Sequence, residues 1–448
     1  MEKTSRDALP ASIETISIVS NEDPSKSVEL AGKGLASFYY HESILEDTVK
    51  ADLSYVDTGN VENIGKNVLE GLPIVGTEKV TIKFTDNSGV KIGASPKLEL
   101  YVNSVNPVYD DTRKGVVGLS LVSKEFILNE KIRLRQRYDG PISDNVKKIL
   151  TDQLPEGLAT QKDVSDFDDT QGDYSFIGNN LKSLYTINWL SKKSVSSKQS
   201  KGSSAGYFFY ETSQGYHFKS IDSLQGQEPK KKIVYNEVTD KSSNGGGEDY
   251  DYKALEYSKD NLVQAQNKFR FGAYSTRLVC FDPFNCEYQV IEQSAEENER
   301  LDKLTLGGKK LPKLNEEFRV TGDKKDFTRT TYALLDTGTL PTGDVEEQIE
   351  KSNEENFDLR NVLNQSIMRY NQFLAFSASI TIPGDFSLHA GDAITLDVPL
   401  LQQGDTRDVS ARDSGLYIIT DLTHFISGSD TLTKLSLVRD STGKKRQG

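Results

Sequence analysis

The sequence has few of the residues from which disulfide frameworks and metal centres are built. Its 448 residues contain two cysteines, one tryptophan and four histidines. Cys280 and Cys286 could close a small disulfide loop, but two thiols do not make a secreted framework, so we expect reduced, structural thiols. None of the histidines has the spacing that seats a metal on one helix face: His41, His217, His389 and His424. His217 and His424 lie in strand patterns, which favours hydrogen-bonded packing roles.

Long apolar runs and excess positive charge are also missing. No stretch approaches the roughly 20 residues of a membrane span, and the opening MEKTSRDALPASIE lacks the apolar core of a signal peptide. We therefore expect synthesis and residence in a cytoplasm. With 54 Lys and Arg against 67 Asp and Glu, the formal net charge is −13. This charge disfavours nucleic acid and anionic membranes as binding partners.

Motifs for catalysis and cofactor binding are absent. There is no G-x-S-x-G elbow for a nucleophilic serine. The segment GKGLA at 32–36 leads into a strand pattern, and the Gly-rich loop at 239–251 lacks the ending of a phosphate-binding loop. A carboxylate pair such as Asp249 and Asp251 is unremarkable among 67 acidic residues. We predict that the chain is not an enzyme and has no catalytic, cofactor-binding or metal-binding residues.

What the sequence does contain is strand periodicity at both ends. In the first 130 residues side chains alternate with a period of two, and DTGN and DNSG mark turns. The alternating positions are Leu35, Ser37, Tyr39; Val49, Ala51, Leu53, Tyr55; Val80, Ile82, Phe84; and Leu98, Leu100, Val102. This pattern predicts an antiparallel sheet that could curl into a barrel.

The last third of the chain returns to strands. Gly384 and Gly391 can adopt positive φ at turns, which would let strands 376–382 and 393–398 pair. We expect Ser414 and Gly415 to open the next strand, with a core that includes Ile380, Ile394 and Leu396. An apolar stripe predicts a helix just before these strands: Leu359, Val362, Leu363, Ile367, Tyr370, Phe373 and Leu374.

Between the two strand-rich regions the pattern is mixed. Helices are predicted near 122–136 and 143–154, the second N-capped by Ser143 with one apolar face of Val146, Ile149, Leu150 and Leu154. The segment GYFFYETSQGYHFKSIDSL predicts a hairpin in which Phe208 and Tyr210 face Tyr216 and Phe218.

Three further segments predict linkers or surface loops. The Ser/Lys-rich 191–205 has no apolar stripe, so it should be mobile or lie on a surface. The acidic loop 239–251 and the acidic run 343–358 are expected to be solvated.

The most specific pattern consists of ITIPGDFSLHAGDAITLDVP, SGLYIITDLTHF and LTKLSLVRDS, in that order. These segments resemble the last β-module of central baseplate hub proteins of contractile-tailed, T-even-like phages, especially their cyanophage relatives. INWLSKKSV and the hairpin segment resemble the middle of those proteins, and YYHESILEDTVKADLSYVDTG resembles their first module. The likeness covers most of the chain and is weak from about 239 to 355.

The resemblance implies an α+β, mainly β fold. It has two tail-tube-like antiparallel β-barrel modules with a helix each, plus an inserted α/β and irregular region. The first barrel domain would be residues 1–130 and the inserted peripheral domain 131–205 with 241–355. The second barrel domain would be 206–240 with 356–442, followed by a tail at 443–448.

The resemblance also implies a function. The chain would be a structural virion protein, the central hub of the tail baseplate, assembled in the host cytoplasm. As a homotrimer it would present six similar barrels and adapt a six-fold tail tube to a three-fold spike. Its partners would be spike, tube and wedge proteins, with DNA as a passenger in the channel and no membrane insertion. An acidic channel wall would then follow from the charge of −13.

Two other functions stay open. A receptor- or carbohydrate-binding tail protein would expose clusters of aromatic side chains on loops. A cell-wall-degrading tail enzyme would need an acidic residue in the cleft of an α-rich lobe, and the sequence shows no such lobe.

Overall fold

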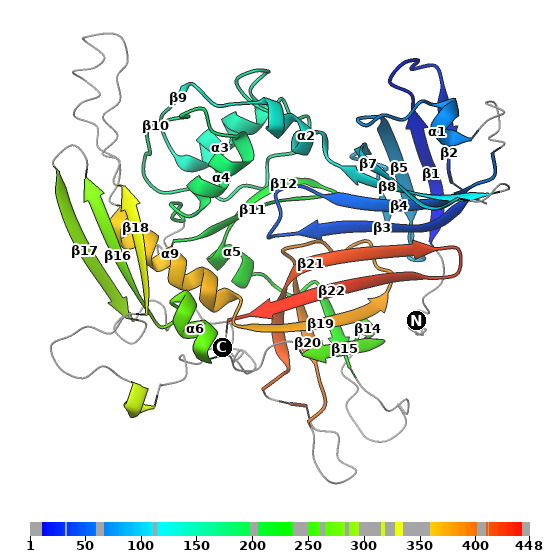
Figure 1. Cartoon of the computed structure of the whole chain (residues 1–448). Helices are drawn as coiled ribbons and strands as arrows, with labels where there is room; N and C mark the ends of the chain where they lie inside the picture. Colours follow the sequence, from blue (N-terminus) through cyan, green and yellow to red (C-terminus); the bar gives the residue numbers. More distant parts are fainter. Residues whose placement is uncertain are drawn as a thin grey trace.

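Strands dominate the described part of the chain (Figure 1). The computed structural model describes residues 11–31, 34–59, 67–110, 114–197, 205–235, 250–259, 265–282, 286–294, 315–318, 328–334, 359–400, 409–410 and 412–440. The predicted acidic segments at 239–249 and 343–358 lie outside these ranges, and so does Asp249. None of the helices within these ranges is long and apolar enough to cross a membrane.

The first strand-rich region forms an antiparallel sheet with the order β3-β4-β8-β7-β5-β1-β2, with the short β6 beside β5. Its elements are β1 Ser12–Val19, β2 Ser27–Glu29, β3 Leu35–Ser43, β4 Lys50–Asp57, α1 Val68–Gly71, β5 Lys79–Thr85, β6 Lys91–Ile92, β7 Leu98–Asp110 and β8 Gly115–Val122. The predicted alternation is confirmed in β4, β5 and β7, whose apolar rows are buried in one core. In β3 that core takes Phe38 and Tyr40, and Tyr39 faces solvent.

The second strand-rich region is built from segments of the middle and the last third of the chain. Its strands are β13 Lys231–Val234, β14 Tyr252–Lys253, β15 Glu256–Lys259, β19 Phe376–Pro383, β20 Ala393–Asp397, β21 Gly415–Ser427 and β22 Thr431–Arg439. Ile380, Ile394 and Leu396 lie in its core, as predicted. The predicted pairing of 376–382 with 393–398 is wrong: β19 pairs with β22 and β15, and β20 pairs with β21 and β13.

The two glycines of this region differ from each other. Gly391 has the predicted positive φ of 90°. Gly384 is not among the residues with positive φ, so that prediction is wrong. A Cβ at Gly384 would collide with the side chain of Thr431, so close packing, and not a left-handed turn, favours glycine there. Gly415 begins β21, as predicted.

The two regions share one sheet. β21 pairs with β22 along one edge, while its other edge pairs first with β20 and then with β3, from Asp421 opposite Ser43 to Ser427 opposite Ser37. Together the described strands of the two regions form a 15-stranded sheet. Their pairing closes no barrel, so the two barrel modules expected from the resemblance are seen here as one continuous sheet (Figure 1).

A helical lobe packs beside this sheet. It contains α2 Lys124–Lys131, β9 Arg137–Tyr138, α3 Ile142–Thr151, β10 Phe176–Ile177 and α4 Ser183–Ser191. The N-cap of α3 is Pro141, two residues earlier than predicted. Ser143 is buried inside the helix, where its N–H donates to Thr170 Oγ1 at 3.0 Å. Leu154 lies beyond the helix and is exposed.

The predicted hairpin exists as β11 Tyr207–Thr212 and β12 Gly215–Ser220, followed by α5 Ile221–Gln225. Its predicted facing is wrong, because Phe218 lies opposite Phe209 and not on the face of Phe208. Phe209 and Phe218 pack into the core of the helical lobe, while Phe208 and Tyr210 pack toward α5 and the second strand region. The hairpin therefore carries apolar side chains on both faces and joins two cores.

The helix α9 Leu359–Phe373 is confirmed, but its buried residues differ from the predicted stripe. Phe373 is buried and Leu374 is exposed. Most of the other buried side chains of the helix are polar: Asn364, Gln365, Ser366, Arg369 and Gln372. α9 packs against a three-stranded sheet of β16 Ser275–Asp282, β17 Glu287–Ser294 and β18 Arg329–Leu334, with α6 Ala265–Phe271 nearby and a short 3-10 helix at Glu316–Phe318.

Two smaller predictions are also decided by the described residues. Cys280 is buried, Cys286 is exposed, and no disulfide joins them. The described part of the Ser/Lys linker is mostly buried: Lys192 and Ser197 are exposed, whereas Ser194, Val195 and Ser196 are buried. They are buried because Thr170 and Ala205 form bridges with this segment. The domain boundaries given above stay a prediction.

Candidate functional site

The solvent face of the central sheet combines small hydroxyl side chains with charged and aromatic ones, among them Tyr39 and Phe425, whose ring centroids lie 4.8 Å apart. Because side chains alternate across a strand, burying one face of β3, β4, β8, β19, β21 and β22 leaves the other row outside. That row includes Ser37, Ser54, Ser120, Ser377, Ser379, Ser436 and Thr423. The register continues across the β3–β21 junction, so the face runs unbroken from one strand region to the other (Figure 1). We call it the hydroxyl face.

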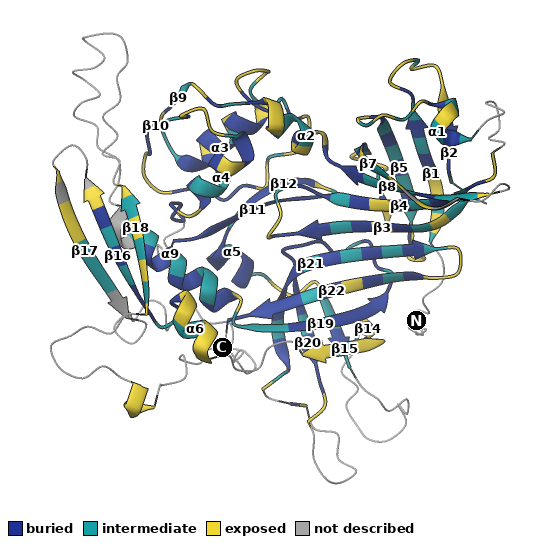
Figure 2. Ribbon diagram, viewed as in Figure 1, coloured by how far each residue is buried: buried dark blue, intermediate teal, exposed yellow. Residues whose placement is uncertain are grey.

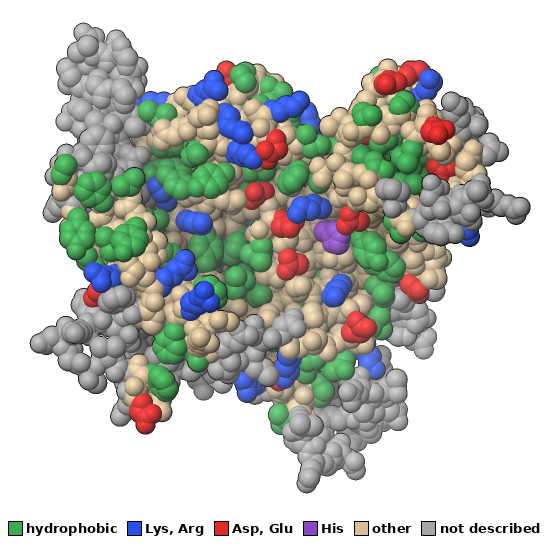
Figure 3. Space-filling model, in the orientation of Figure 1, with side chains coloured by type: hydrophobic (Ala, Val, Ile, Leu, Met, Phe, Trp, Pro, Cys, Tyr) green, Lys and Arg blue, Asp and Glu red, His purple; other side chains and the backbone are tan. Residues whose placement is uncertain are grey.

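Charges on the hydroxyl face are balanced. On β3, β4, β21 and β22 it carries Asp52 and Asp421 against Lys50 and Lys434. His41 Nδ1 lies 3.0 Å from Thr423 Oγ1, and its Nε2 lies 3.5 Å from Asp52. In Figure 3 acidic and basic side chains are interspersed over the middle of the molecule. The net charge of −13 is therefore not concentrated on these strands.

On the buried side of the sheet, Glu42 at the end of β3 forms hydrogen bonds to the turn between β11 and β12 and to the segment before β20. Its carboxylate accepts hydrogen bonds from Ser213 N at 2.8 Å, Ala390 N at 3.1 Å and Tyr40 Oη at 3.0 Å. Both of its oxygens lie 3.3 Å from His389 Nδ1. Burial opposes ionisation of Glu42, but the nearby charge and hydrogen bond of His389 outweigh it and lower the pKa to about 2. Burial likewise opposes protonation of His389, whose pKa Glu42 nevertheless raises.

A second buried ionic cluster ties the helical lobe to the hairpin. Lys162 Nζ lies 2.7 Å from Glu125 on α2 and 2.5 Å from Glu211 on β11. Glu211 also accepts from Ser123 Oγ at 2.7 Å and from Val49 N at 3.1 Å, so it reaches the first strand region too. Burial raises the pKa of Glu211. The charges of the two carboxylates raise the pKa of Lys162 against the opposing effect of its own burial.

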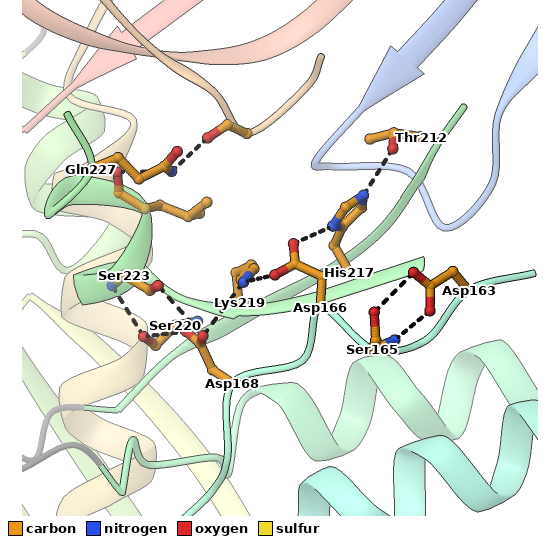
Figure 4. A network of polar contacts seen from close by, with 12 residues as sticks. Asp163, Ser165, Asp166, Asp168, Thr212, His217, Lys219, Ser220, Ser223 and Gln227 are labelled. Carbon is orange, nitrogen blue, oxygen red and sulfur yellow. Dashed lines mark hydrogen bonds and ion pairs between the residues drawn. The ribbon is translucent and has the colours of Figure 1, made fainter. Parts of the chain in front are cut away.

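Figure 4 shows a third polar network, which joins β12 to the segment containing Asp166 and Asp168. Asp166 accepts from His217 Nδ1 at 2.7 Å and from Lys219, and His217 Nε2 lies 2.8 Å from Thr212 Oγ1. Burial opposes ionisation of Asp166, but these hydrogen bonds lower the pKa to about 2. Asp168 accepts from Ser220 N at 3.0 Å. The network holds the segment between α3 and β10 against β12.

Helix α9 is fixed by a buried ion pair. Arg369 donates from Nη2 to Asp222 at 2.7 Å and from Nη1 to the same carboxylate at 3.2 Å. Nη1 also donates to the carbonyl of Ala205 at 3.2 Å. Tyr370 Oη accepts from the N–H of Tyr207 at 2.9 Å. α9 thereby holds the start of the hairpin and of α5 in place.

The chemistry of these clusters is structural. Each buried carboxylate faces a lysine, arginine or histidine, or several N–H and O–H donors, which is how folded proteins stabilise buried charge. Among the residues with described positions, no group of three His, Cys, Asp or Glu side chains could hold a metal ion. His217 and His424 are hydrogen-bonded within strands, as predicted, the latter to Thr433 Oγ1 at 2.9 Å. Burial lowers the pKa of His424 to about 3.

Sequence reasoning missed the residues that join the modules: Glu42, Lys162, Glu211 and Arg369. One signal was available for two of them. Glu42 follows the strand-like FYYH and Glu211 follows YFFY, so each is a carboxylate next to a strongly apolar strand segment. Lys162 and Arg369 carry no comparable signal, because lysine and arginine are ordinary in loops and on helices.

Comparisons with known proteins bear on the fold alone. No protein-family model and no curated protein matches the sequence. Among solved structures, the chain is similar to a tail protein from Neisseria meningitidis at 9% identity and a TM-score of 0.50, covering 96% of this chain and 97% of that one. A 43 kDa prophage tail protein from Shewanella oneidensis matches at 9% identity and a TM-score of 0.49, covering 95% and 98%. A prophage tail protein from Listeria monocytogenes matches at 8% identity and 0.45, covering 96% and 95%.

The chain shares the overall fold of the tail protein from Neisseria meningitidis. The similarity to the Neisseria protein extends over almost the full length of both chains, so it includes the helical lobe and both strand regions. At 9% identity it carries information about fold and none about individual residues.

Proposed function

We propose that the chain is a structural protein of a phage tail baseplate, and more specifically its central hub. Three copies would form a ring that adapts a six-fold tail tube to a three-fold spike. The supporting observation is the continuous sheet, in which two strand regions of one chain lie side by side through the β3–β21 pairing. Three such chains present six comparable strand surfaces, and a trimer retains three-fold symmetry elsewhere.

In this ring the hydroxyl face would line the channel through which DNA leaves the virion. A DNA-binding surface neutralises phosphates with Lys and Arg, and each such contact strengthens adhesion. On the solvent side of β3, β4, β21 and β22 two aspartates, Asp52 and Asp421, offset two lysines, Lys50 and Lys434. The serines and threonine of this face add no charge. A near-neutral channel wall would let DNA slide through. The acidic wall expected from the net charge of the whole chain is therefore not needed.

The remaining parts of the proposal concern neighbours and location. The chain would reside in the virion after assembly in the host cytoplasm, in contact with tube, spike and wedge proteins. The buried clusters around Glu42 and Lys162 would make the protomer one rigid unit, as an adaptor between tube and spike requires. No catalytic step is assigned to the chain.

Mass photometry of the purified chain tests the proposal. A hub should show a species of three times the 49.8 kDa chain mass at micromolar concentration, and negative-stain class averages should show a ring with an open centre. A chain that stays monomeric at concentrations up to 50 μM would contradict the hub, because even weak specific contacts form at such a concentration.

A further inference from the structure

The turn between β3 and β4, residues 44–49, meets the hairpin and α4 at a buried contact. The N–H of Val49 donates to Glu211 Oε2 on β11 at 3.1 Å. Asp47 accepts at Oδ1 from Asn188 Nδ2 on α4 at 2.6 Å. Val49 and Glu211 are buried and Asp47 is half-buried, and β11 and β12 are buried over almost their whole length (Figure 2). We call the contact made by these two hydrogen bonds the turn contact.

Glu211 belongs to a cluster with more negative than positive charge. Lys162 Nζ is shared by Glu125 and Glu211, at 2.7 Å and 2.5 Å. One lysine and two carboxylates leave a net charge of −1 when all three are ionised. Two carboxylates that share one buried site disfavour each other's ionisation. Burial raises the pKa of Glu211 against the opposing charge of Lys162, and the charge of Glu125 raises it further.

Asp47 is the second carboxylate of the turn contact. Lys50, at the start of β4, lies 2.8 Å from Glu46 and is thereby paired with another carboxylate. Burial raises the pKa of Asp47, and the hydrogen bond from Asn188 offsets only part of this effect. The charge of Glu46 raises the pKa further. Asp47 and Glu211 are therefore both protonated more easily in the folded chain than in an unfolded one.

The other titratable groups around Glu211 keep their charge state in mildly acidic solution. Lys162 lowers the pKa of Glu125 despite its burial, and His389 helps to lower the pKa of Glu42 to about 2, so both carboxylates stay ionised. Burial raises the pKa of the tyrosines that neighbouring elements present to the cluster, so they stay uncharged: Tyr40 on β3, Tyr101 on β7 and Tyr216 on β12.

A proton on Glu211 fits the contacts that the carboxylate already makes. Ser123 Oγ lies 2.7 Å from Oε2, and a hydroxyl group can accept a hydrogen bond as well as donate one. A proton taken from solvent by Oε2 can therefore be donated to Ser123, while Oε1 keeps its contact with Lys162. Oε2 still has a lone pair for the N–H of Val49, and the cluster of Lys162, Glu125 and Glu211 becomes neutral.

We propose that the turn contact is a pH-sensitive device, which becomes more stable as Glu211 and Asp47 take up protons between neutral and mildly acidic pH. A carboxylate whose pKa is higher in the closed contact than in the open one binds more protons when the contact is closed. Closure therefore becomes more favourable as the pH falls, and this gain is absent where both carboxylates are charged. The device lies within one copy of the chain and does not depend on the proposed ring.

Hydrogen exchange of the β3–β4 turn, followed by mass spectrometry, measures this dependence. The N–H of Val49 is buried and bonded across the contact, so it exchanges when the contact opens. After correction for the intrinsic exchange rate at each pH, we expect the turn peptide of the wild type to be at least about twofold better protected at pH 5 than at pH 7.5. In the double variant Asp47→Asn, Glu211→Gln both side chains are neutral at either pH, so the two protections should become equal.

Two single variants complete the comparison. Glu130→Gln removes an exposed carboxylate of α2 that pairs with Lys182, so this control should keep the ratio of the wild type. Asp47→Asn alone changes a half-buried position and should lower the ratio in part, which tests the inference even where Glu211→Gln weakens the fold. Trp189 fluorescence confirms that each variant is folded.

Three results would overturn the inference. The first is equal protection of the wild-type turn at the two pH values. The second is a pH dependence that persists in the double variant, because it would then belong to another group, such as His389, whose pKa Glu42 raises. The third is a pH dependence that Glu130→Gln abolishes as well, because the effect would then follow the charge of the whole chain and not the turn contact.

Discussion

Replacing Lys162 with methionine should destabilise the helical lobe more than any surface substitution. The methionine keeps the length of the side chain but removes the ammonium group that lies 2.7 Å from Glu125 and 2.5 Å from Glu211. Both carboxylates are buried. Removing one partner of a buried ion pair costs about 3 to 5 kcal/mol, a large part of the 5 to 15 kcal/mol by which domains are typically stable.

Urea unfolding followed by Trp189 fluorescence measures this loss. Trp189 is the single tryptophan and packs against Tyr174 and Phe176 in the core of the lobe, so its emission reports on the lobe that Lys162 supports. With a denaturant dependence of about 2 kcal/mol per molar urea, a loss of about 4 kcal/mol lowers the midpoint by about 2 M.

The matched control is Lys182→Met, which removes an ion pair of the same 2.5 Å length between exposed side chains. Exposed pairs contribute about 0 to 1 kcal/mol, so this midpoint should move by less than about 0.5 M. Because burial raises the pKa of Glu211, protonation below pH 5 should relieve the charge left by Lys162→Met and shrink the difference from wild type. Equal midpoints for the two variants at pH 7 would refute the view that Lys162 holds the lobe.

Two further predictions concern the second strand region. Glu42 raises the pKa of His389, so their ion pair stabilises the fold fully below about pH 6.5 and less as pH rises through the raised pKa. Between pH 6 and 9 the melting temperature should therefore fall more steeply for the wild type than for His389→Gln. Parallel curves of melting temperature against pH would contradict this. Gly391→Ala forces a positive φ on alanine and drives its Cβ into the Tyr210 hydroxyl, so it should cost about 2 kcal/mol or more in urea unfolding. Gly428→Ala, whose Cβ would meet nothing within 4 Å, is the control, and equal losses would remove the steric explanation.

The strands of the first region were predictable because burial there follows local alternation. In β4, β5 and the first half of β7 every second residue is apolar, and those residues form one core. A period of two needs no knowledge of the partner strand. The order of the strands was not predictable in the same way. β3 pairs with β21, some 380 positions later, and nothing in either segment encodes that choice locally.

Side-chain facing failed where both faces of an element are apolar. In the hairpin Tyr207, Phe208, Phe209 and Tyr210 are all buried, so the apolar pattern does not show which side chains share a face. The predicted facing of the two strands was therefore wrong. The pairing of Phe209 with Phe218 follows from the two-residue turn between Thr212 and Gly215. A three-residue Ser-Gln-Gly turn, which the predicted facing requires, would shift the register by one residue and exchange the faces.

The buried ion pairs between the strand regions and the helical lobe show why a function that depends on surfaces is hard to predict from the sequence. A buried ion pair such as Arg369 with Asp222 consists of residues that are ordinary on any exposed helix or turn, and only the fold brings them together. The hydroxyl face is built from serine and threonine, which are equally common in loops. What distinguishes both is the continuous sheet: the same β3–β21 pairing that aligns the hydroxyl rows also places Glu42 beside His389, so one long-range contact creates the proposed channel wall and the junction that holds it rigid.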